Sequence, residues 1–263
     1  MMKIKCKKFI TAILSLMIGA VLLAPAVTYA QNDTATSTPT KTVKDPCAIY
    51  SEKMATLAQK TADNQANLDL KRANQLSSLN NKRADFDNRL AGSRLNSDQK
   101  RAVQIGKLMD RASTTDAQKA AIASFQSAVE KAVADRRTAI DSAIAAYRAA
   151  LDKALADRKT SVDQATSAYK DAVKAAYAKA LNDCQAKVDK KTVRKNLNAD
   201  LKAAKTKFNT DRQSINKFIV LIAPLAKTRQ QAINDAAKSY QTAINAARTD
   251  LKAAFPPKTK KSK

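Results

Sequence analysis

The sequence predicts an all-α fold, an elongated antiparallel helical hairpin or bundle of long Ala-rich helices with 11- and 22-residue repeats. Three observations lead to this prediction. Residues 136–181 contain neither glycine nor proline and are built from a repeated 22-residue unit. Larger apolar side chains recur there at every eleventh position. Two cysteines far apart in the sequence, Cys47 and Cys184, fit a polypeptide that doubles back on itself.

The repeat defines one long amphipathic helix. Arg136 and Tyr147 of the first copy match Arg158 and Tyr169 of the second, and a fainter third copy begins at Arg229. The eleven-residue step runs through Ile140, Leu151, Val162, Val173 and Cys184. A period of about 3.67 residues per turn keeps the apolar stripe straight or slightly right-handed. Alanines on this stripe allow close helix contacts that bury little apolar area. The alternative is a single Ala-rich helix in solvent, which is marginally stable.

Residues 1–30 have the pattern of a secretory signal peptide. Four lysines precede an apolar region from Phe9 to Leu23, and Thr28-Tyr29-Ala30 is typical of a cleavage site. We therefore expect an exported protein, secreted, periplasmic or on the cell surface, cleaved near Ala30. The alternative is an uncleaved N-terminal helix that anchors the protein in a membrane. Residues 31–45 are rich in Thr and Ser and predict a disordered linker.

The rest of the sequence predicts one elongated helical domain, residues 46–255, and a basic tail, residues 256–263. Asp45 and Pro46 mark the first helix start, and Thr115 with Gln118 forms a capping box for the long repeat helix. Gly92 is expected to stop or kink the first helix, with Asn96-Ser97 capping a shorter one. The long repeat helix is expected to loosen near Asn196–Asn198, and Pro224 is expected to kink or end a helix. The predicted helices cover about residues 46–91, 97–112, 116–195, 198–223 and 225–255.

The two cysteines outside the signal test this layout. If the polypeptide reverses near Thr114, Cys47 lies 67 residues before the reversal and Cys184 lies 70 residues after it. The mismatch corresponds to roughly 5 Å along a helix, within reach of a disulfide, and each arm would be on the order of 100 Å long. Export places both thiols where disulfides persist. Spacing alone also permits free thiols or pairing between two molecules.

The most apolar stretch outside the signal is Phe218–Ala226. It is too short to span a membrane. Packing against the hairpin is the ordinary explanation, and a membrane-dipping tip or a partner site is the alternative.

Positive charge dominates the sequence. The net charge of +25 falls to +21 without the four signal lysines, and such a field attracts polyanions. An anionic polymer or an anionic membrane surface is therefore an expected partner, and a protein partner or self-association along the alanine stripe fits the same features. No sequence-specific nucleic-acid recognition is expected, because no recognised reading head is present. A solvated basic surface is the alternative reading. The candidate polyanion-binding residues are Lys187, Lys190, Lys191, Arg194, Lys195, Lys202, Lys205, Lys207, Lys258, Lys260, Lys261 and Lys263.

The composition argues against an enzyme. The sequence has no histidine, which removes the usual catalytic base and the commonest metal ligand. Gly92 and Gly106 are the only glycines after the signal, so a phosphate-cradling loop is excluded. We expect no catalytic, cofactor-binding or metal-binding residues and no cofactor. The recurring aspartates are interpreted as surface ion pairs: Asp135, Asp141, Asp152, Asp157, Asp163 and Asp171.

Together these features predict an exported, non-enzymatic helical scaffold or interaction protein of the cell envelope that binds anionic polymers through a basic surface. Two alternatives remain open at this stage. One is an amphipathic protein that lies on a lipid surface. The other is a periplasmic, chaperone-like helical clamp.

Overall fold

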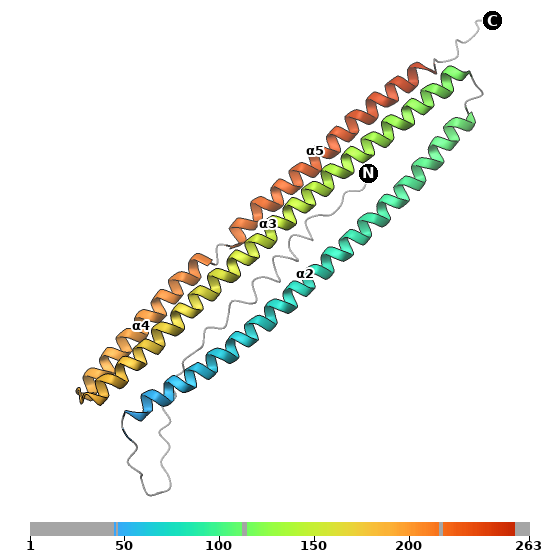
Figure 1. The fold of residues 1–263 in the computed structure, drawn as a ribbon. Helices are drawn as coiled ribbons and strands as arrows, with labels where there is room; N and C mark the ends of the chain where they lie inside the picture. Colours follow the sequence, from blue (N-terminus) through green and yellow to red (C-terminus); the bar gives the residue numbers. More distant parts are fainter. Residues whose placement is uncertain (1–44, 46, 112–114, 216–217, 256–263) are drawn as a thin grey trace, which may run out of the picture. The chain divides into compact units, whose positions relative to one another are not determined.

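Four long helices make up the described part of the protein, and no strand occurs in it. The computed structural model describes residues 45, 47–111, 115–215 and 218–255. Its helices are α2 (Ala48–Arg111), α3 (Asp116–Gln185), α4 (Lys190–Ile215) and α5 (Phe218–Ala253), labelled in Figure 1 where there is room. The predicted all-α class is confirmed. The predicted signal peptide, most of the linker and the basic tail lie outside the described residues.

Side-chain caps fix the starts of α2 and α3 where the sequence places them. The backbone N–H of Cys47 donates to Oδ1 of Asp45 at 2.9 Å, directly before the first helical residue. The N–H of Gln118 donates to Oγ1 of Thr115 at 3.4 Å, just before α3. These bonds satisfy helix N–H groups that have no carbonyl partner within the helix.

The break predicted at Gly92 is wrong, because α2 continues through it to Arg111. Gly92 has no positive φ, and a Cβ there would meet nothing within 4 Å. The hydroxyl of Ser97 donates to the carbonyl of Ser93 inside the helix and caps no new one. Glycine lowers helix stability by about 1 kcal/mol. Cross-helix ion pairs at Asp87 and Arg94, on either side of Gly92, offset this cost.

The helix end predicted as one outcome at Pro224 is also wrong, because α5 runs from Phe218 through Pro224 to Ala253. Proline leaves the carbonyl four residues earlier without its N–H partner. That carbonyl belongs to Val220, which is 69% exposed, so water can reach it. Ile222 and Ala226 are buried on either side of the proline and hold this part of α5 in place.

The backbone does turn between α3 and α4, but earlier than predicted. α3 ends at Gln185 and not near residue 195. Lys187 adopts a left-handed φ of 59°, and the N–H of Val188 donates to the carbonyl of Asp183 at 3.0 Å, which is the pattern of a Schellman C-cap. Asp189 then caps α4 by accepting the N–H of Thr192 at 3.0 Å. The region 196–198 lies inside α4.

Contacts divide the protein into two units that each contain three helical segments. Unit 1 combines the residues up to Ser78 with Leu155–Val220, and unit 2 combines Leu79–Ala154 with the residues from Leu221 onward. The first part of α2, the second part of α3 and α4 thus belong to unit 1. The second part of α2, the first part of α3 and nearly all of α5 belong to unit 2.

Each unit has its own small apolar core. In unit 1 the core lies between α3 and α4, and Tyr50 of α2 packs against it. Its buried members are Ala176, Ala180, Val193 and Leu197. In unit 2 the core lies between α3 and α5, with Phe125 and Tyr240 packed against it, and its buried members are Val129, Ala132, Val133 and Ile244. The repeat helix is therefore packed and not a single helix in solvent, and alanines supply much of the buried stripe, as predicted.

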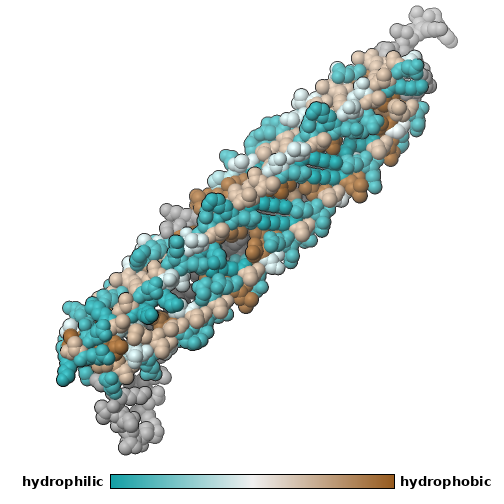
Figure 2. Space-filling model, in the orientation of Figure 1, coloured by the Kyte–Doolittle hydropathy of each residue, from teal (hydrophilic) through white to brown (hydrophobic). Residues whose placement is uncertain are grey.

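Helix α2 contributes little to these cores. Leu79 is the one buried hydrophobic residue within α2, and no residue of α2 belongs to the core cluster of unit 2. Large apolar residues such as Leu70, Leu95 and Val103 are exposed on it. Figure 2 shows strongly hydrophobic residues as small separate groups on a mostly hydrophilic face. No described helix combines the length and apolar character needed to cross a membrane.

Candidate functional site

Cys47 and Cys184 form a disulfide within one molecule. Their Cα atoms are 5.7 Å apart and their sulfurs 2.09 Å apart. The bond joins the start of α2 to the last turn of α3, as the spacing predicted. The closed loop spans a sequence separation of 137 residues, and the chain-entropy model gives a loop of this size a stabilisation of about 5 kcal/mol as an upper figure. Three segments meet here, because the α3–α4 turn begins directly after Cys184.

The predicted basic residues of the described part lie on this turn and along α4. Lys187 occupies the left-handed position of the turn. Six exposed cations on α4 form a surface that we call the α4 basic face: Lys190, Lys191, Arg194, Lys195, Lys202 and Lys205. Two positions repeat after eleven residues, Lys191 with Lys202 and Arg194 with Lys205, which places like charges about 16 Å apart along the helix. The lower-left part of Figure 2, where the α3–α4 turn lies, is mostly hydrophilic.

The acidic groups of α4 do not neutralise this face. Asp200 accepts an ion pair from Lys179 of α3 at 3.2 Å, and Asp211 accepts one from Lys207 at 2.8 Å. Both α4 carboxylates are thus engaged away from the six cations. Among the described residues these six cations form no salt bridge within 4.0 Å. Lys207, in contrast, is paired and does not add uncompensated charge to the face. The tail candidates Lys258, Lys260, Lys261 and Lys263 lie outside the described residues.

A small open depression adjoins this face beside the disulfide. It has a volume of about 210 Å³ and is lined by Tyr50, Cys184, Val188, Lys190, Val193 and Arg194. Its walls come from the start of α2, the end of α3 and the start of α4. Two members of the α4 basic face therefore lie at its edge, next to apolar side chains and one phenol.

A second feature, absent from the sequence-based prediction, is a ladder of Arg–Asp pairs between α2 and α3. In unit 2, Arg83 donates two hydrogen bonds to Asp152, at 3.1 and 2.7 Å. Arg94 does the same to Asp141, at 3.0 and 2.6 Å. Each step of eleven residues forward on α2 matches a step of eleven residues backward on α3. We call this row of pairs the Arg–Asp seam.

The seam of unit 2 also contains pairs with the opposite direction. Arg148 of α3 donates two hydrogen bonds to Asp87 of α2, at 2.9 and 2.7 Å. Arg137 of α3 donates to Asp98 at 2.6 Å. Two-point contacts between a guanidinium and a carboxylate combine charge with a fixed geometry. The guanidinium of Arg148 lowers the pKa of Asp87 by hydrogen bonding, and Asp87 in turn raises the pKa of Arg148.

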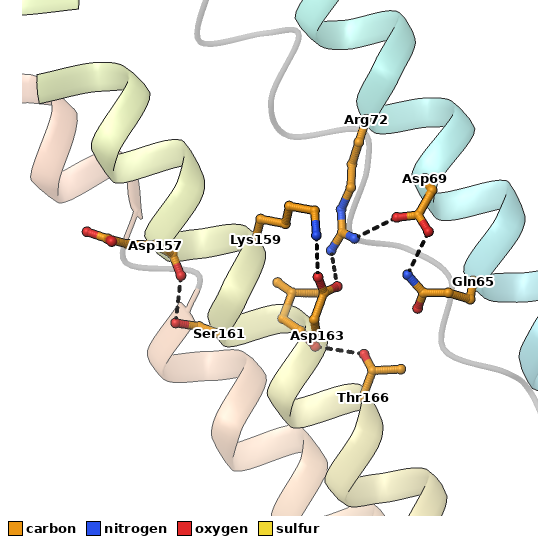
Figure 3. Close-up of polar contacts among 9 residues, drawn as sticks. Gln65, Asp69, Arg72, Asp157, Lys159, Ser161, Asp163 and Thr166 are labelled. Carbon is orange, nitrogen blue, oxygen red and sulfur yellow. Dashed lines mark hydrogen bonds and ion pairs between the residues drawn. The ribbon is translucent and has the colours of Figure 1, made fainter. Parts of the chain in front are cut away.

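Unit 1 contains a pair of the same kind, Arg72 and Asp163, whose charged atoms lie 2.7 Å apart (Figure 3). Asp163 also accepts Lys159 at 2.8 Å, and Asp69 accepts both Arg72 and Gln65 at 3.0 Å. Burial raises the pKa of Asp163, but the hydrogen bonds from Lys159 and Arg72 outweigh it, so the pKa is lowered. Hydrogen bonds from Gln65 and Arg72 lower the pKa of Asp69.

Four of the six repeated aspartates are surface ion pairs, as expected, and three of these reach a different helix, whereas Asp171 accepts a hydrogen bond from Ser167 at 3.5 Å. Asp135 pairs with Lys131 within α3, whereas Asp141, Asp152 and Asp163 pair with arginines of α2. The sequence did contain a signal for this arrangement, because Arg72, Arg83 and Arg94 have the same eleven-residue spacing as their partners.

On another side of α3, arginine–aromatic contacts connect it to α5, and a contact between two aromatic rings connects it to α4. In unit 2 the guanidinium carbon of Arg229 lies 4.4 Å from the ring centre of Tyr147, and that of Arg136 lies 5.1 Å from the ring centre of Tyr240. The first and third copies of the repeat thus pack against each other antiparallel, and each supplies one arginine and one tyrosine. In unit 1, Tyr169 contacts the ring of Phe208 of α4 at 5.0 Å.

No group of three or more Cys, Asp or Glu residues within the described ranges is arranged to hold a metal ion. The arrangement offers an exposed cationic helix held by a disulfide-linked corner, and a polar seam along a long helix pair. Comparison with protein-family models, with characterised proteins and with solved structures finds no match.

Proposed function

We propose that this protein is a non-enzymatic helical scaffold that binds anionic polymers through the α4 basic face. One observation carries the proposal. Six exposed cations line α4, while both acidic residues of that helix are occupied by Lys179 and Lys207. A surface that keeps its carboxylates away from its cations presents an uncompensated positive field, which attracts a polyanion and raises its local concentration.

The packing of α4 against α3, next to the disulfide, supports a scaffold role. Val193 and Leu197 of α4 pack with Ala176 and Ala180 of α3, and the disulfide fixes the neighbouring end of α3 to α2. The helix therefore presents its cations from a rigid support, so little conformational entropy is lost when they bind a ligand. Lysine side chains contribute mainly as point charges, which favours anions in general over one defined sequence or sugar.

The spacing along α4 favours a linear ligand. The pairs Lys191 with Lys202 and Arg194 with Lys205 repeat one hendecad apart, about 16 Å. A string of phosphate, sulfate or carboxylate groups lying along the helix can contact both pairs at once. Binding of this kind releases counterions and weakens steeply as salt rises. We place the scaffold in an exported compartment of the cell envelope, in keeping with the signal-like residues 1–30 and the disulfide.

A second candidate is binding to an anionic membrane surface. Val220 and Leu221 at the start of α5 are 69% and 62% exposed, and adjacent exposed apolar side chains favour insertion at a lipid interface. The alanine stripe of α3 is a poor lipid contact, because Ala132, Ala176 and Ala180 are buried against α5 or α4. A lipid contact through α5 would thus depend on two side chains together with the basic charge.

Binding to linear polyphosphate, measured at several salt concentrations, tests the proposal. Reversing four cations of the face (Lys191, Arg194, Lys202 and Lys205 to Glu) is expected to weaken affinity at least tenfold and to flatten the salt dependence. A matched variant reverses four exposed lysines elsewhere (Lys60, Lys71, Lys107 and Lys238 to Glu), which gives the same net charge. Equal losses in the two variants would show that net charge alone attracts the polymer and would contradict the proposed face.

Binding to vesicles of anionic lipid, measured alongside polyphosphate binding, distinguishes the membrane-surface candidate from the polyanion scaffold. Replacing Val220 and Leu221 by Ser leaves the α4 cations in place. If this variant loses vesicle binding but keeps polyphosphate binding, membrane contact through α5 is the better description. If both ligands depend on the α4 cations alone, the polyanion scaffold stands.

A further inference from the structure

The Arg–Asp seam of unit 2 has a self-complementary pattern. On α2, an arginine is followed four residues later by an aspartate in Arg83/Asp87 and again in Arg94/Asp98. On α3, the same unit occurs in Arg137/Asp141 and in Arg148/Asp152. Read in opposite directions, each arginine of one helix meets an aspartate of the other. A helix carrying this unit can therefore pair antiparallel with any other helix that carries it.

We propose that this seam is a self-recognition surface through which a second copy of the protein is bound by exchange. In the exchanged dimer, the α2 segment of one copy lies on the α3 segment of the other, and all four unit 2 pairs re-form between the copies. The two copies contribute the same surfaces, which is the arrangement of an isologous, two-fold symmetric interface.

The composition of unit 2 keeps the free-energy cost of such an exchange low. Its core cluster consists of α3 and α5 residues, so replacing one α2 by another leaves that cluster intact. In each pair the aspartate side chain is roughly half exposed and the arginine side chain less so, with 49% for Asp152 and 19% for Arg83. Opening the seam in water exposes charged groups that are readily hydrated, together with the buried or half-buried apolar side chains of α2 in this unit, among them Leu79, Phe86 and Leu90.

The connection between the two helices also favours exchange. α2 ends at Arg111 and α3 begins at Asp116, so four residues separate two long helices that pair with each other. Exchange of an identical element between two copies, with such a connection as the hinge, is a low-cost route to a dimer. Within one molecule the effective concentration of the partner helix is high, so the closed form dominates in dilute solution. The exchanged form requires two molecules, and its share should rise with protein concentration.

The disulfide fixes whichever form, closed monomer or exchanged dimer, is present when it forms. Once Cys47 and Cys184 are joined within one molecule, α2 is closed on α3 at that end. If exchange precedes oxidation, Cys47 of one copy meets Cys184 of the other. Thiol–disulfide exchange with a small-molecule disulfide such as oxidised glutathione then joins the two sulfurs, and the oxidant is reduced to two thiols, so that the new disulfide is intermolecular. Exchange is thus confined to reduced or newly made molecules. After oxidation, an intermolecular Cys47–Cys184 disulfide identifies the exchanged form.

Refolding a mixture of ¹⁵N-labelled and unlabelled reduced protein, followed by oxidation, tests the proposal in the wild-type sequence. Non-reducing mass mapping then identifies Cys47–Cys184 links that join a labelled to an unlabelled peptide. The proposal predicts such hybrid links in a species of doubled mass, with a share that increases with concentration. Intramolecular links alone at every concentration would overturn it.

Two variants with inverted charges test whether the Arg–Asp complementarity of α2 and α3 determines pairing between copies. The acidic-α2 variant carries Arg83→Asp and Arg94→Asp, so its α2 unit is acidic throughout. The basic-α3 variant carries Asp141→Arg and Asp152→Arg, so its α3 unit is basic throughout. Each variant alone has two like-charge pairs, but in a mixed dimer the acidic α2 faces the basic α3 and the two wild-type segments face each other. The two variants refolded together should therefore form a 1:1 dimer of doubled mass, linked by intermolecular disulfides.

A single polypeptide that carries all four substitutions is the control. Its inverted pairs are complementary within the molecule, so in dilute solution it should fold, like the wild type, mainly as a closed monomer with an intramolecular disulfide. This variant establishes that the inverted charges are compatible with the fold. If it folds while the acidic-α2 and basic-α3 variants stay separate, with intramolecular links only, the seam does not recognise a second copy and the proposal fails.

Discussion

Arg229 of α5 lies over the ring of Tyr147 of α3, with 4.4 Å between its guanidinium carbon and the ring centre. The Nε atom of Arg229 is buried and has no hydrogen-bond partner among the described residues. The face of the tyrosine ring is therefore the main favourable contact for this buried part of the cation. The same pair types recur in Arg136 and Tyr240 with the helices interchanged, so two copies of one repeat bind each other through reciprocal contacts.

Replacing Tyr147 by Leu should lower the free energy of unfolding by about 1–2 kcal/mol, since a partly desolvated cation–π contact is lost. Tyr147→Phe keeps the aromatic face and should change stability much less. Urea unfolding of Tyr147→Leu, Arg229→Gln and the double variant gives the coupling energy directly. Strictly additive effects would mean that the stacking contributes no coupling.

Acid should weaken the Arg–Asp seam. The pKa values of Asp87 and Asp163 lie below the ordinary 3.8, because Arg148 hydrogen-bonds to the first, and Lys159 and Arg72 outweigh the effect of burial at the second. Carboxylates with lowered pKa values stabilise the fold above the unfolded value of 3.8, and this contribution is lost as pH falls through the folded values. Melting temperatures of the oxidised protein should be nearly constant from about pH 7 to 5 and fall below about pH 4.

The variant Asp87→Asn is the control for this acid effect. It is expected to be less stable than the wild type at neutral pH, where Arg148 loses its charged partner. Its stability should change less between about pH 5 and 2, because one lowered carboxylate is missing. An unchanged acid profile in this variant would place the acid sensitivity elsewhere.

Removing the disulfide by Cys47→Ser and Cys184→Ser should cost up to about 5 kcal/mol, the chain-entropy limit for so large a loop. Loss of hydrogen-exchange protection should be greatest in the first turns of α2, where Tyr50 is the residue that packs on the unit 1 core. Urea unfolding with and without reductant measures the total effect. Equal protection of α2 in both forms would mean that packing alone holds this end.

The backbone offers two stabilising substitutions. Gly92→Ala should raise the free energy of unfolding by about 0.5–1 kcal/mol, because Gly92 lies inside α2 and a Cβ there meets nothing within 4 Å. Lys187→Gly should also stabilise the fold, because Lys187 has a φ of 59°, a conformation that glycine adopts without strain. Lys187→Ala keeps the Cβ and is the matched control. A destabilised Gly92→Ala protein would contradict the continuity of α2 at this position.

Buried positions of unit 2 outside its core cluster should also tolerate truncation poorly. Leu151 is 1% exposed, and Leu151→Ala should cost about 2–5 kcal/mol. Leu95→Ala removes the same atoms from an exposed site of α2 and should be nearly neutral. Thermal unfolding of the two variants gives the comparison, and similar losses would mean that Leu95 is covered in solution.

The sequence was sufficient to predict those parts of the fold that depend on local contacts or on a covalent bond. Thr115 caps α3 through Gln118, three residues away, and the distances of Cys47 and Cys184 from the reversal agreed to within a helical turn. It was insufficient where distant residues override a local preference. Gly92 and Pro224 favour breaks, but ion pairs on either side of Gly92 and burial on either side of Pro224 keep those helices continuous.

The basic face could be predicted in composition but not in arrangement. Lys207 belongs to the same run of lysines, yet Asp211 one turn later pairs with it. The partners of Asp141 and Asp152 lie on another helix, and identifying them requires the register of α2 against α3. That register follows from the eleven-residue spacing only after the two helices are known to run antiparallel.

Alanine supplies many of the buried positions of both units, and α2 has one buried hydrophobic residue, Leu79, beside its ion pairs with α3. Unfolding such a molecule hydrates little apolar surface for its length. Because apolar hydration is the positive contribution to the heat capacity of unfolding, that heat capacity should be small per residue. A small value flattens the curve of stability against temperature, so this protein should lose little stability on cooling as well as on moderate warming.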